Sequence, residues 1–238
     1  MLPRPFLIAA AVLLVLAASR GGAEQPSART PRDLEGWTVR VDERLLAPPH
    51  EELGRQALRF LEAKLVEIKA VVPAEPLAEL QKVAIVLDLE CDGLGAMQYH
   101  PSADWLVEHG YPRDLAKCVH LPQAADVATR RNINEQPWVI LHELAHAYHD
   151  QVLGFDEPWI AAAYDQFKES GHGAAALLYD GTRVRHYGLT DPKEFFAEMT
   201  EAYFGSNDFY PFNRAELKES EPRLYELLEK IWRPAIKN

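Results

Sequence analysis

Residues 142–146 read H-E-L-A-H, and this pattern constrains the fold more than any other feature of the chain. Residues four apart lie on one face of a helix, so the imidazoles of His142 and His146 can reach the same metal ion. Glu143 can then address a water at that metal. The apolar residues around the motif form a stripe on the other side of the helix: Leu141, Leu144, Ala145 and Tyr148. The pattern predicts a helix seated in a core, with its polar face toward a cleft that binds one zinc ion per chain.

A catalytic zinc site needs a third protein ligand and leaves its fourth position to water. His149 lies on the same helix face, but three ligands in a row on one helix cannot converge on one ion. We therefore expect His149 to be a polar or hydrogen-bonding residue one turn beyond the site. Val152 stands where the third histidine of the metzincin pattern would be. The third ligand must come from another part of the chain.

A second helix is predicted from Asp191 to about Phe204, because an N-cap residue followed by Pro192 is typical of a helix start. Three acidic residues share one face of this helix: Glu194, Glu198 and Glu201. Charges at helical spacing usually mark a face in contact with solvent. Beside a motif that lacks one carboxylate, they become the leading source of the third ligand.

The segment around this helix also resembles a known family. Residues 187–198 read Y-G-L-T-D-P-K-E-F-F-A-E, with a Tyr-Gly pair seven residues before E-F-F-A-E. This arrangement resembles the matching segment in the catalytic domain of anthrax lethal factor, a gluzincin-type zinc metallopeptidase. The resemblance implies zinc ligands at His142, His146 and Glu194, a general base at Glu143, and a tyrosine, Tyr187, that assists at the transition state. The resemblance covers two short blocks. This chain is far shorter than the toxin and has no counterpart of its large substrate-recognition regions, so toxin activity and kinase substrates are not implied.

Glu198 lies one helical turn beyond Glu194. A metal-bound histidine usually donates its other ring N–H to a carboxylate, which fixes the orientation and tautomer of the ring. Glu198 can fill that role, and a side chain in contact with solvent is the alternative. We expect Glu198 to orient one of the two histidines.

The first residues resemble a secretory signal peptide. Arg4 precedes the apolar run Phe6–Ala18, which is too short to span a bilayer, and small residues follow it. We expect residues 1–23 to be removed, residues 24–36 to form a polar linker, and residues 37–238 to form one catalytic domain. Removal would change the net charge from −11 to −13, because it deletes two Arg and no acid. The expected location is outside the cytoplasm, either secreted or periplasmic.

The two cysteines of the chain, Cys91 and Cys118, would then enter an oxidising compartment. A disulfide between them and two ordinary core cysteines are both compatible with this. Neither cysteine lies in a recognisable nucleophile motif, so a catalytic thiol is not expected.

The hydrophobic pattern predicts an α+β fold, with a small sheet from the first half of the chain packed on helices from the second. The resemblance implies that this fold is of the zincin-like metallopeptidase type, with a small mixed sheet packed on the motif helix and a helical C-terminal part. Predicted strands begin at Trp37 and cover Val83–Leu89 and Cys118–Leu121, the last at a sheet edge, and Asp180-Gly181 predicts a hairpin turn whose second strand is Thr182–Tyr187. Predicted helices cover Glu51–Val71, Ala103–Glu108, Gln136–Gln151, Glu157–Glu169 and Glu221–Trp232.

The leading hypothesis is a secreted zinc metallopeptidase that hydrolyses peptide bonds by a zinc-activated water, with Glu143 as general base. The edge of Cys118–Leu121 would receive an extended peptide by strand addition. The competing hypothesis is a zincin-like zinc-binding domain with a protein- or cell-wall-binding role and little peptidase activity. Peptides or proteins are the expected substrates. The acidic net charge argues against nucleic acid, and no stable membrane insertion is expected after signal cleavage.

Overall fold

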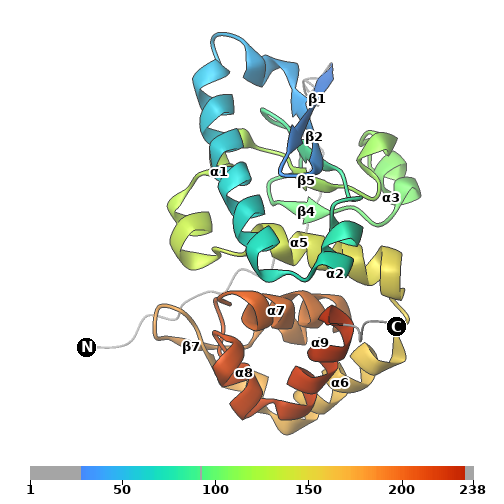
Figure 1. Cartoon of the computed structure of the whole chain (residues 1–238), viewed down its shortest axis with the longest axis vertical. Helices are drawn as coiled ribbons and strands as arrows, with labels where there is room; N and C mark the ends of the chain where they lie inside the picture. The colour runs from blue at the N-terminus through green and yellow to red at the C-terminus, as the bar shows by residue number, and fades with distance from the viewer. Residues whose placement is uncertain (1–27, 92, 234–238) are drawn as a thin grey trace, which may run out of the picture.

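The structure is a computed structural model that describes residues 28–91 and 93–233 (Figure 1). The predicted signal peptide and residues 24–27 of the predicted linker lie outside the described residues. In the first half of the chain, a five-stranded mixed sheet has the order β1-β2-β3-β5-β4. Its strands are β1 (Arg29–Leu34), β2 (Trp37–Asp42), β3 (Ile85–Leu87), β4 (Gln98–Tyr99) and β5 (Val119–Leu121). The β2–β3 and β3–β5 pairs are parallel, and the β1–β2 and β4–β5 pairs are antiparallel.

The prediction of a linker over residues 24–36 is wrong for its second part. Residues Arg29–Leu34 form β1, which pairs with β2 over six residue pairs. Glu35 and Gly36 connect the strands, and both have positive φ angles, 56° and 94°. This conformation suits a two-residue hairpin, because its twist matches that of the paired strands. β1 is an edge strand with several exposed residues, so its sequence shows no apolar alternation.

The prediction that Cys118–Leu121 lies at a sheet edge is also wrong. The strand exists as β5, but it lies between β3 and β4. All three of its residues are buried, because neighbours cover both its sides and both its faces. β4, a two-residue strand in the segment predicted to be a long loop, forms the edge instead.

Helices make up most of the second half of the chain (Figure 1). The described helices are α1 (Glu51–Val71), α2 (Ala74–Leu80), α3 (Ala103–Glu108), α4 (Ala124–Val127), α5 (Val139–Tyr148), α6 (Pro158–Ser170), α7 (Pro192–Phe204), α8 (Arg214–Ser220) and α9 (Pro222–Trp232). The predicted helices at α1, α3, α6, α7 and α9 are confirmed to within one or two residues. The hairpin at Asp180-Gly181 is confirmed in type, but its strands are short: β6 (Ala176–Leu177) and β7 (Arg183–Val184).

Helix α5 lies between the sheet and the C-terminal helices (Figure 1). It contacts α1, β4 and β5 on one side and α7 on the other. A single apolar core therefore extends through both halves, with Leu61, Leu87, Leu141, Phe196 and Trp232 among its members. The predicted fold class, an α+β fold with a small mixed sheet packed on the motif helix, is confirmed. In the described part of the chain, no helix combines the length and apolar character needed to cross a membrane.

Candidate metal centre

The H-E-x-x-H motif lies on α5, in the middle of the molecule. The predicted apolar stripe of this helix is buried in the core, as expected for a helix seated by one face. His142 and Glu143 are also largely buried, and they line a cavity on the opposite face. The α-helix is shorter than the predicted Gln136–Gln151 at both ends. It begins at Val139, and after Tyr148 the residues His149–Leu153 continue it as a π-helical segment.

Helix α7 supplies the acidic residues of the site. The Asp191 carboxylate accepts hydrogen bonds from the backbone N–H groups of Lys193 (2.7 Å) and Glu194 (3.1 Å). These bonds satisfy two backbone donors that a helix leaves unpaired at its N-terminus. The position of Glu194 in the first turn is therefore fixed by a local cap.

A glycine allows the end of α7 to approach the start of α5. A Cβ atom on Gly205 would lie 2.0 Å from Cε2 of Trp138, which is the residue before α5. Such a separation is far shorter than any van der Waals contact. Only glycine fits here without displacing the indole ring, so Gly205 helps to set the distance between the two helices.

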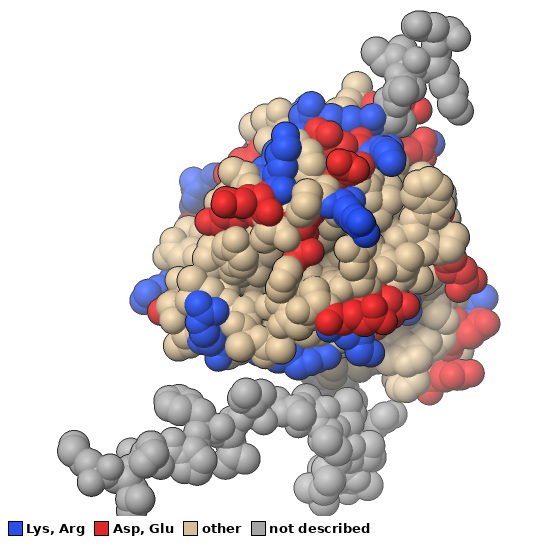
Figure 2. All heavy atoms as spheres, turned by 90° about the horizontal axis from the view of Figure 1, so that it is seen from below, with Lys and Arg blue, Asp and Glu red and all other residues tan. Residues whose placement is uncertain are grey.

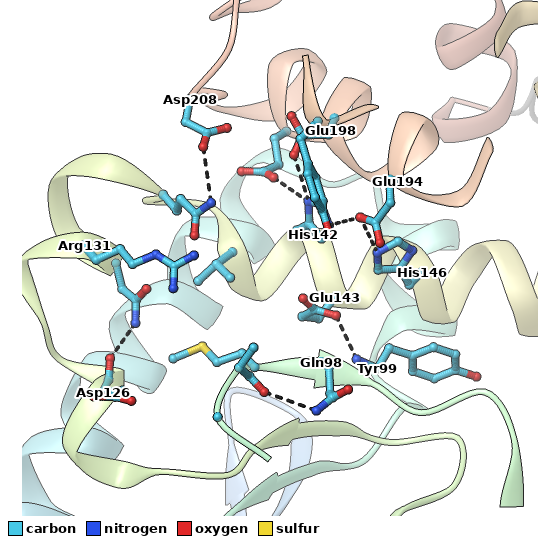
Figure 3. Close-up of a pocket in the computed structure, with 18 of the residues that line it drawn as sticks. Gln98, Tyr99, Asp126, Arg131, His142, Glu143, His146, Glu194, Glu198 and Asp208 are labelled. Carbon is cyan, nitrogen blue, oxygen red and sulfur yellow. Dashed lines mark hydrogen bonds and ion pairs between the residues drawn. The ribbon is translucent and has the colours of Figure 1, made fainter. Parts of the chain in front are cut away.

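The structure brings together the three residues that the sequence suggests as metal ligands (Figure 3). Oε2 of Glu194 lies 3.1 Å from Nε2 of His142 and 3.4 Å from Nε2 of His146. One donor atom from each residue falls within 4.8 Å of the other two. Two imidazole nitrogens and one carboxylate oxygen form a common donor set of a catalytic zinc site.

The other nitrogen of His142 faces a second carboxylate, and this residue is Glu201. The distance from Nδ1 of His142 to Oε1 of Glu201 is 2.7 Å, whereas the distance to Oε1 of Glu198 is 3.8 Å. The prediction that Glu198 makes the orienting hydrogen bond to a motif histidine is therefore wrong. Glu201 lies about one helical turn beyond Glu198 on α7. Both glutamates are buried, so they do not form the solvated acidic face that charges at this spacing usually mark.

Burial and neighbouring charges shift the pKa values of these groups in opposite directions. Burial alone would raise the pKa of Glu194, but hydrogen bonds with His142 and His146 lower it well below its usual range. Burial dominates at Glu198 and raises its pKa well above the ordinary value, and the nearby charge of Glu201 adds to this increase. Among the described residues, no Lys or Arg lies within ion-pair distance of these glutamates, whose ion pairs are all with histidine. Burial alone would lower the pKa of His142, but carboxylate contacts raise it well above its ordinary value, so the described partners of these carboxylates are imidazoles and not Lys or Arg.

Glu143 is held by the edge strand of the sheet. Its Oε2 accepts a hydrogen bond of 2.8 Å from the backbone N–H of Tyr99 in β4 (Figure 3). Burial raises the pKa of the Glu143 carboxyl, and the histidines beside it oppose this increase. A carboxylate with a raised pKa and a fixed position suits a group that must accept and return a proton.

Tyr187 lines the same cavity as the acidic residues. It lies in a 3-10 turn, Tyr187–Leu189, and not at the end of a strand as predicted, because β7 ends at Val184. The turn is fixed by His186, whose Nδ1 accepts a hydrogen bond of 3.0 Å from the N–H of Gly188. The Tyr187 side chain is 47 % exposed, and the pKa of its hydroxyl is raised by partial burial.

His149 lies outside the ligand set, as expected, but it does not form the hydrogen bonds predicted for it. The residue is fully buried, and neither ring nitrogen has a hydrogen-bond partner among the described residues. Its ring packs edge-on against Phe155 and Phe196. Burial lowers the pKa of His149 to about 4, so it acts as a neutral core residue.

A second buried cluster of metal-ligand residue types lies at the sheet. Asp88, Cys91 and His120 offer donor atoms within 4.8 Å of one another. Here the Arg29 guanidinium bonds both oxygens of Asp88, at 2.7 and 2.8 Å, and His120 adds a contact of 2.8 Å. Cys91 and Cys118 are both buried, and no disulfide joins them.

The metal-ligand candidates open onto a cavity of about 720 Å³. Residues 95–99, which include β4, line one wall, and α7 contributes to another. Two features of this cavity were not predicted from the sequence: the contact between Glu201 and His142, and the presence of Arg131 in the wall. Glu201 could be placed on the correct helix face from its spacing, but nothing in the sequence points to Arg131.

Comparison with known proteins agrees with this geometry. A family model described as glucose-regulated metallo-peptidase M90 matches residues 116–233, just under half of the chain, including both α5 and α7. No curated protein and no solved structure shows significant similarity to the chain. The family match supports a metallopeptidase, a hydrolase of peptide bonds that depends on a divalent metal, usually zinc.

Proposed function

We propose that this chain is an exported zinc-dependent peptidase that cleaves peptide bonds with Glu143 as general base. The observation that carries the proposal is the convergence of one donor atom each from His142, His146 and Glu194 within 4.8 Å, at the wall of a cavity. No Lys or Arg of the described residues pairs with Glu194, so a divalent cation could bind there. Export is supported by the sequence alone, through the apolar run Phe6–Ala18 behind Arg4.

The donor set fits zinc. Two neutral imidazole nitrogens and one carboxylate oxygen would hold the ion, which leaves one position open. Glu201 would accept the Nδ1–H of His142 and so direct the Nε2 lone pair of that ring toward the ion. When bound there, zinc supplies a Lewis acid that polarises the scissile carbonyl and brings the pKa of water toward neutrality.

Glu143 would move the protons of the reaction. Its carboxylate takes a proton from the attacking water and then gives it to the departing amine. The N–H of Tyr99 keeps one oxygen of this carboxylate in place, and the second oxygen is left to receive the proton. Burial raises the pKa of Glu143, which makes its conjugate acid easier to form at neutral pH.

Tyr187 would donate its hydroxyl to the oxyanion that develops on the scissile carbonyl. Its partly exposed side chain on the cavity wall supports this role, as does the resemblance of residues 187–198 to lethal factor. Substitution of Tyr187 by Phe keeps the ring and removes the donor. The kcat should fall by about 10²–10³, with zinc content and KM nearly unchanged. A normal kcat in this variant would remove Tyr187 from the mechanism and weaken the lethal factor analogy.

The substrate backbone would be recognised at β4. β4 is the edge strand on the side of the motif helix, and its residues line the cavity. An extended peptide placed along this edge can form main-chain hydrogen bonds by strand addition. This assigns to β4 the role that the sequence suggested for Cys118–Leu121.

The test uses the Glu143→Gln variant beside the wild-type chain. We expect wild type to bind one zinc per chain and to cleave casein or a peptide library in a manner that a chelator abolishes. Glu143→Gln should retain the zinc and lose activity by about 10²–10⁴, the usual contribution of a general base. His146→Ala is the matched control, because it should lose both the zinc and the activity.

Two results would contradict the proposal. Loss of zinc from Glu143→Gln as complete as that from His146→Ala would make Glu143 a ligand and not a base. Stoichiometric zinc in wild type without any cleavage would favour the competing hypothesis of a zinc-containing binding domain.

A further inference from the structure

We infer that Arg131 makes the cavity select substrates with an acidic side chain. Arg131 would bind this side chain on the side of Glu143 that lies opposite His146. The inference rests on the proposed function, because it concerns the same cavity. Figure 3 shows the Arg131 side chain on the side of Glu143 opposite His146, pointing toward the middle of the cavity.

The backbone around Arg131 is fixed. Arg131 begins a π-helical turn, Arg131–Glu135, and its carbonyl accepts a hydrogen bond of 2.8 Å from the N–H of Gln136. The next residue, Asn132, is buried and donates hydrogen bonds to the carbonyls of Asp126 (2.6 Å) and Val127 (3.1 Å). The side chain of Arg131 therefore projects from a well-anchored segment, so binding of a ligand costs less conformational entropy of the backbone.

The guanidinium of Arg131 is available to a ligand. It is the one Lys or Arg among the described residues that line the cavity. No described carboxylate lies within ion-pair distance of it, in contrast to Arg29, Arg40 and Arg214, each of which pairs with an acid. A planar guanidinium in a concave site can bind a carboxylate through two parallel N–H donors.

Two acidic residues share this part of the cavity, and neither forms an ion pair with Arg131. Asp208 is buried and accepts a hydrogen bond of 3.2 Å from Nε2 of Gln136. Burial raises the pKa of its carboxyl, and the more distant charge of Arg131 is among those that oppose this increase. Asp126 is exposed and lies toward the edge of the view in Figure 3. An acidic group that extends past Glu143 can pair with the guanidinium of Arg131, whereas a basic group placed beside Arg131 would be repelled by it.

The experiment measures both cleavage and binding with one series of peptides. A single Glu is moved residue by residue along an otherwise uncharged peptide, and matched peptides carry Gln or Lys at the same positions. Cleavage by the wild-type chain is recorded as kcat/KM. Binding to the zinc-loaded Glu143→Gln variant is recorded as Kd, so that the preference is measurable even without turnover.

At one position in the peptide, we expect Glu to be preferred over Gln by about tenfold at low salt, as for one charge-assisted hydrogen bond. Arg131→Gln should remove this preference, and Arg131→Glu should transfer it to Lys. The control is Arg130→Gln, which changes the neighbouring exposed arginine that does not line the cavity and should keep the wild-type preference. High salt should reduce the preference of the wild-type chain for Glu over Gln, because salt screens interactions between solvent-exposed charges.

Equal values for Glu and Gln at every position would overturn the inference, and so would a preference that persists in Arg131→Gln. Absence of binding by every peptide would also overturn it. Binding that shows the Arg131-dependent preference, without any cleavage by wild type, would support the inference and contradict the proposed peptidase activity.

Discussion

Two buried clusters in this molecule contain the same kinds of residue and differ in their charge balance. At the sheet, the guanidinium of Arg29 donates hydrogen bonds to both oxygens of Asp88, and His120 contacts the same carboxylate. Beside α5, the two motif histidines meet Glu194 and Glu201, and no described Lys or Arg joins them. Both clusters place three possible metal donors within 4.8 Å.

Donor identity and spacing therefore do not distinguish a structural ion pair from a metal centre. The two are distinguished by whether an Arg or Lys of the chain already pairs with the buried carboxylate. A buried charge is costly unless it is paired, and Arg29 already pairs with Asp88. The carboxylates beside α5 have no Arg or Lys partner among the described residues, and the same cluster borders a cavity. We therefore propose that a metal ion supplies the positive charge there.

The largest expected effect tests the balanced cluster. Replacement of Arg29 by Met removes the cation and leaves the Asp88 charge buried, which should lower the free energy of unfolding by about 3–5 kcal/mol. Denaturant unfolding measures this change, and zinc content should stay at the wild-type value. The double variant Arg29→Met, Asp88→Asn should recover part of the loss, since it removes the unpaired charge. A single variant as stable as wild type would show that Arg29 does not balance Asp88.

The next effect tests the unbalanced cluster. Zinc that binds the native state alone should raise the free energy of unfolding by about 2.7 kcal/mol at a free concentration of one hundred times Kd. Glu194→Gln should lose most of this increase, because it removes one donor. Asp88→Asn should keep it. Equal losses in the two variants would mean that the sheet cluster also binds the metal.

A smaller effect separates the two glutamates behind His142. Glu201→Gln should weaken zinc binding by about 10–100-fold, the usual loss when the partner of a ligating histidine is removed. Glu198→Gln should weaken it less, because this carboxylate lies 3.8 Å from the ring nitrogen. Competition titrations with a zinc chelator measure both values. The reverse order would return the orienting role to Glu198.

The smallest effect concerns pH. Burial alone would raise the pKa of Asp88, but hydrogen bonds from Arg29 and His120 lower it below the ordinary 3.8. A lowered folded-state pKa contributes stability above the unfolded-state pKa, and this contribution is lost as the pH falls through the folded-state value. Urea unfolding below pH 4 should therefore show a steeper loss of stability in wild type than in Asp88→Asn. Parallel curves would show that Asp88 does not titrate with folding.

The helices of the site could be predicted because each carries a local signal. The cap at Asp191 and Pro192 marks the start of α7, and the apolar stripe on α5 marks its buried side. The ligand set His142, His146 and Glu194 followed from helical spacing together with a resemblance, and the structure places these three side chains together. Their role as metal ligands remains a prediction that zinc binding must test.

The incorrect predictions concern features that depend on distant neighbours. The sequence of β1 has the polar character of a linker, because its order comes from pairing with β2. Nothing in the sequence indicates a strand beside β5 on its second side, because that neighbour, β4, is only two residues long. Glu198 and Glu201 lie on the same face of α7, and only the way α7 crosses α5 decides which one reaches His142.

The contact between Gly205 and Trp138 has a consequence for metal affinity. His142 on α5 and Glu194 on α7 are 52 residues apart in the sequence. An ion that bound both residues in an unfolded chain would therefore have to close a long loop. Loop closure costs entropy that subtracts from binding. Here the packing of α7 against α5 has already closed the loop before any ion arrives. The absence of a side chain at position 205 thus leaves more of the coordination energy for holding the metal.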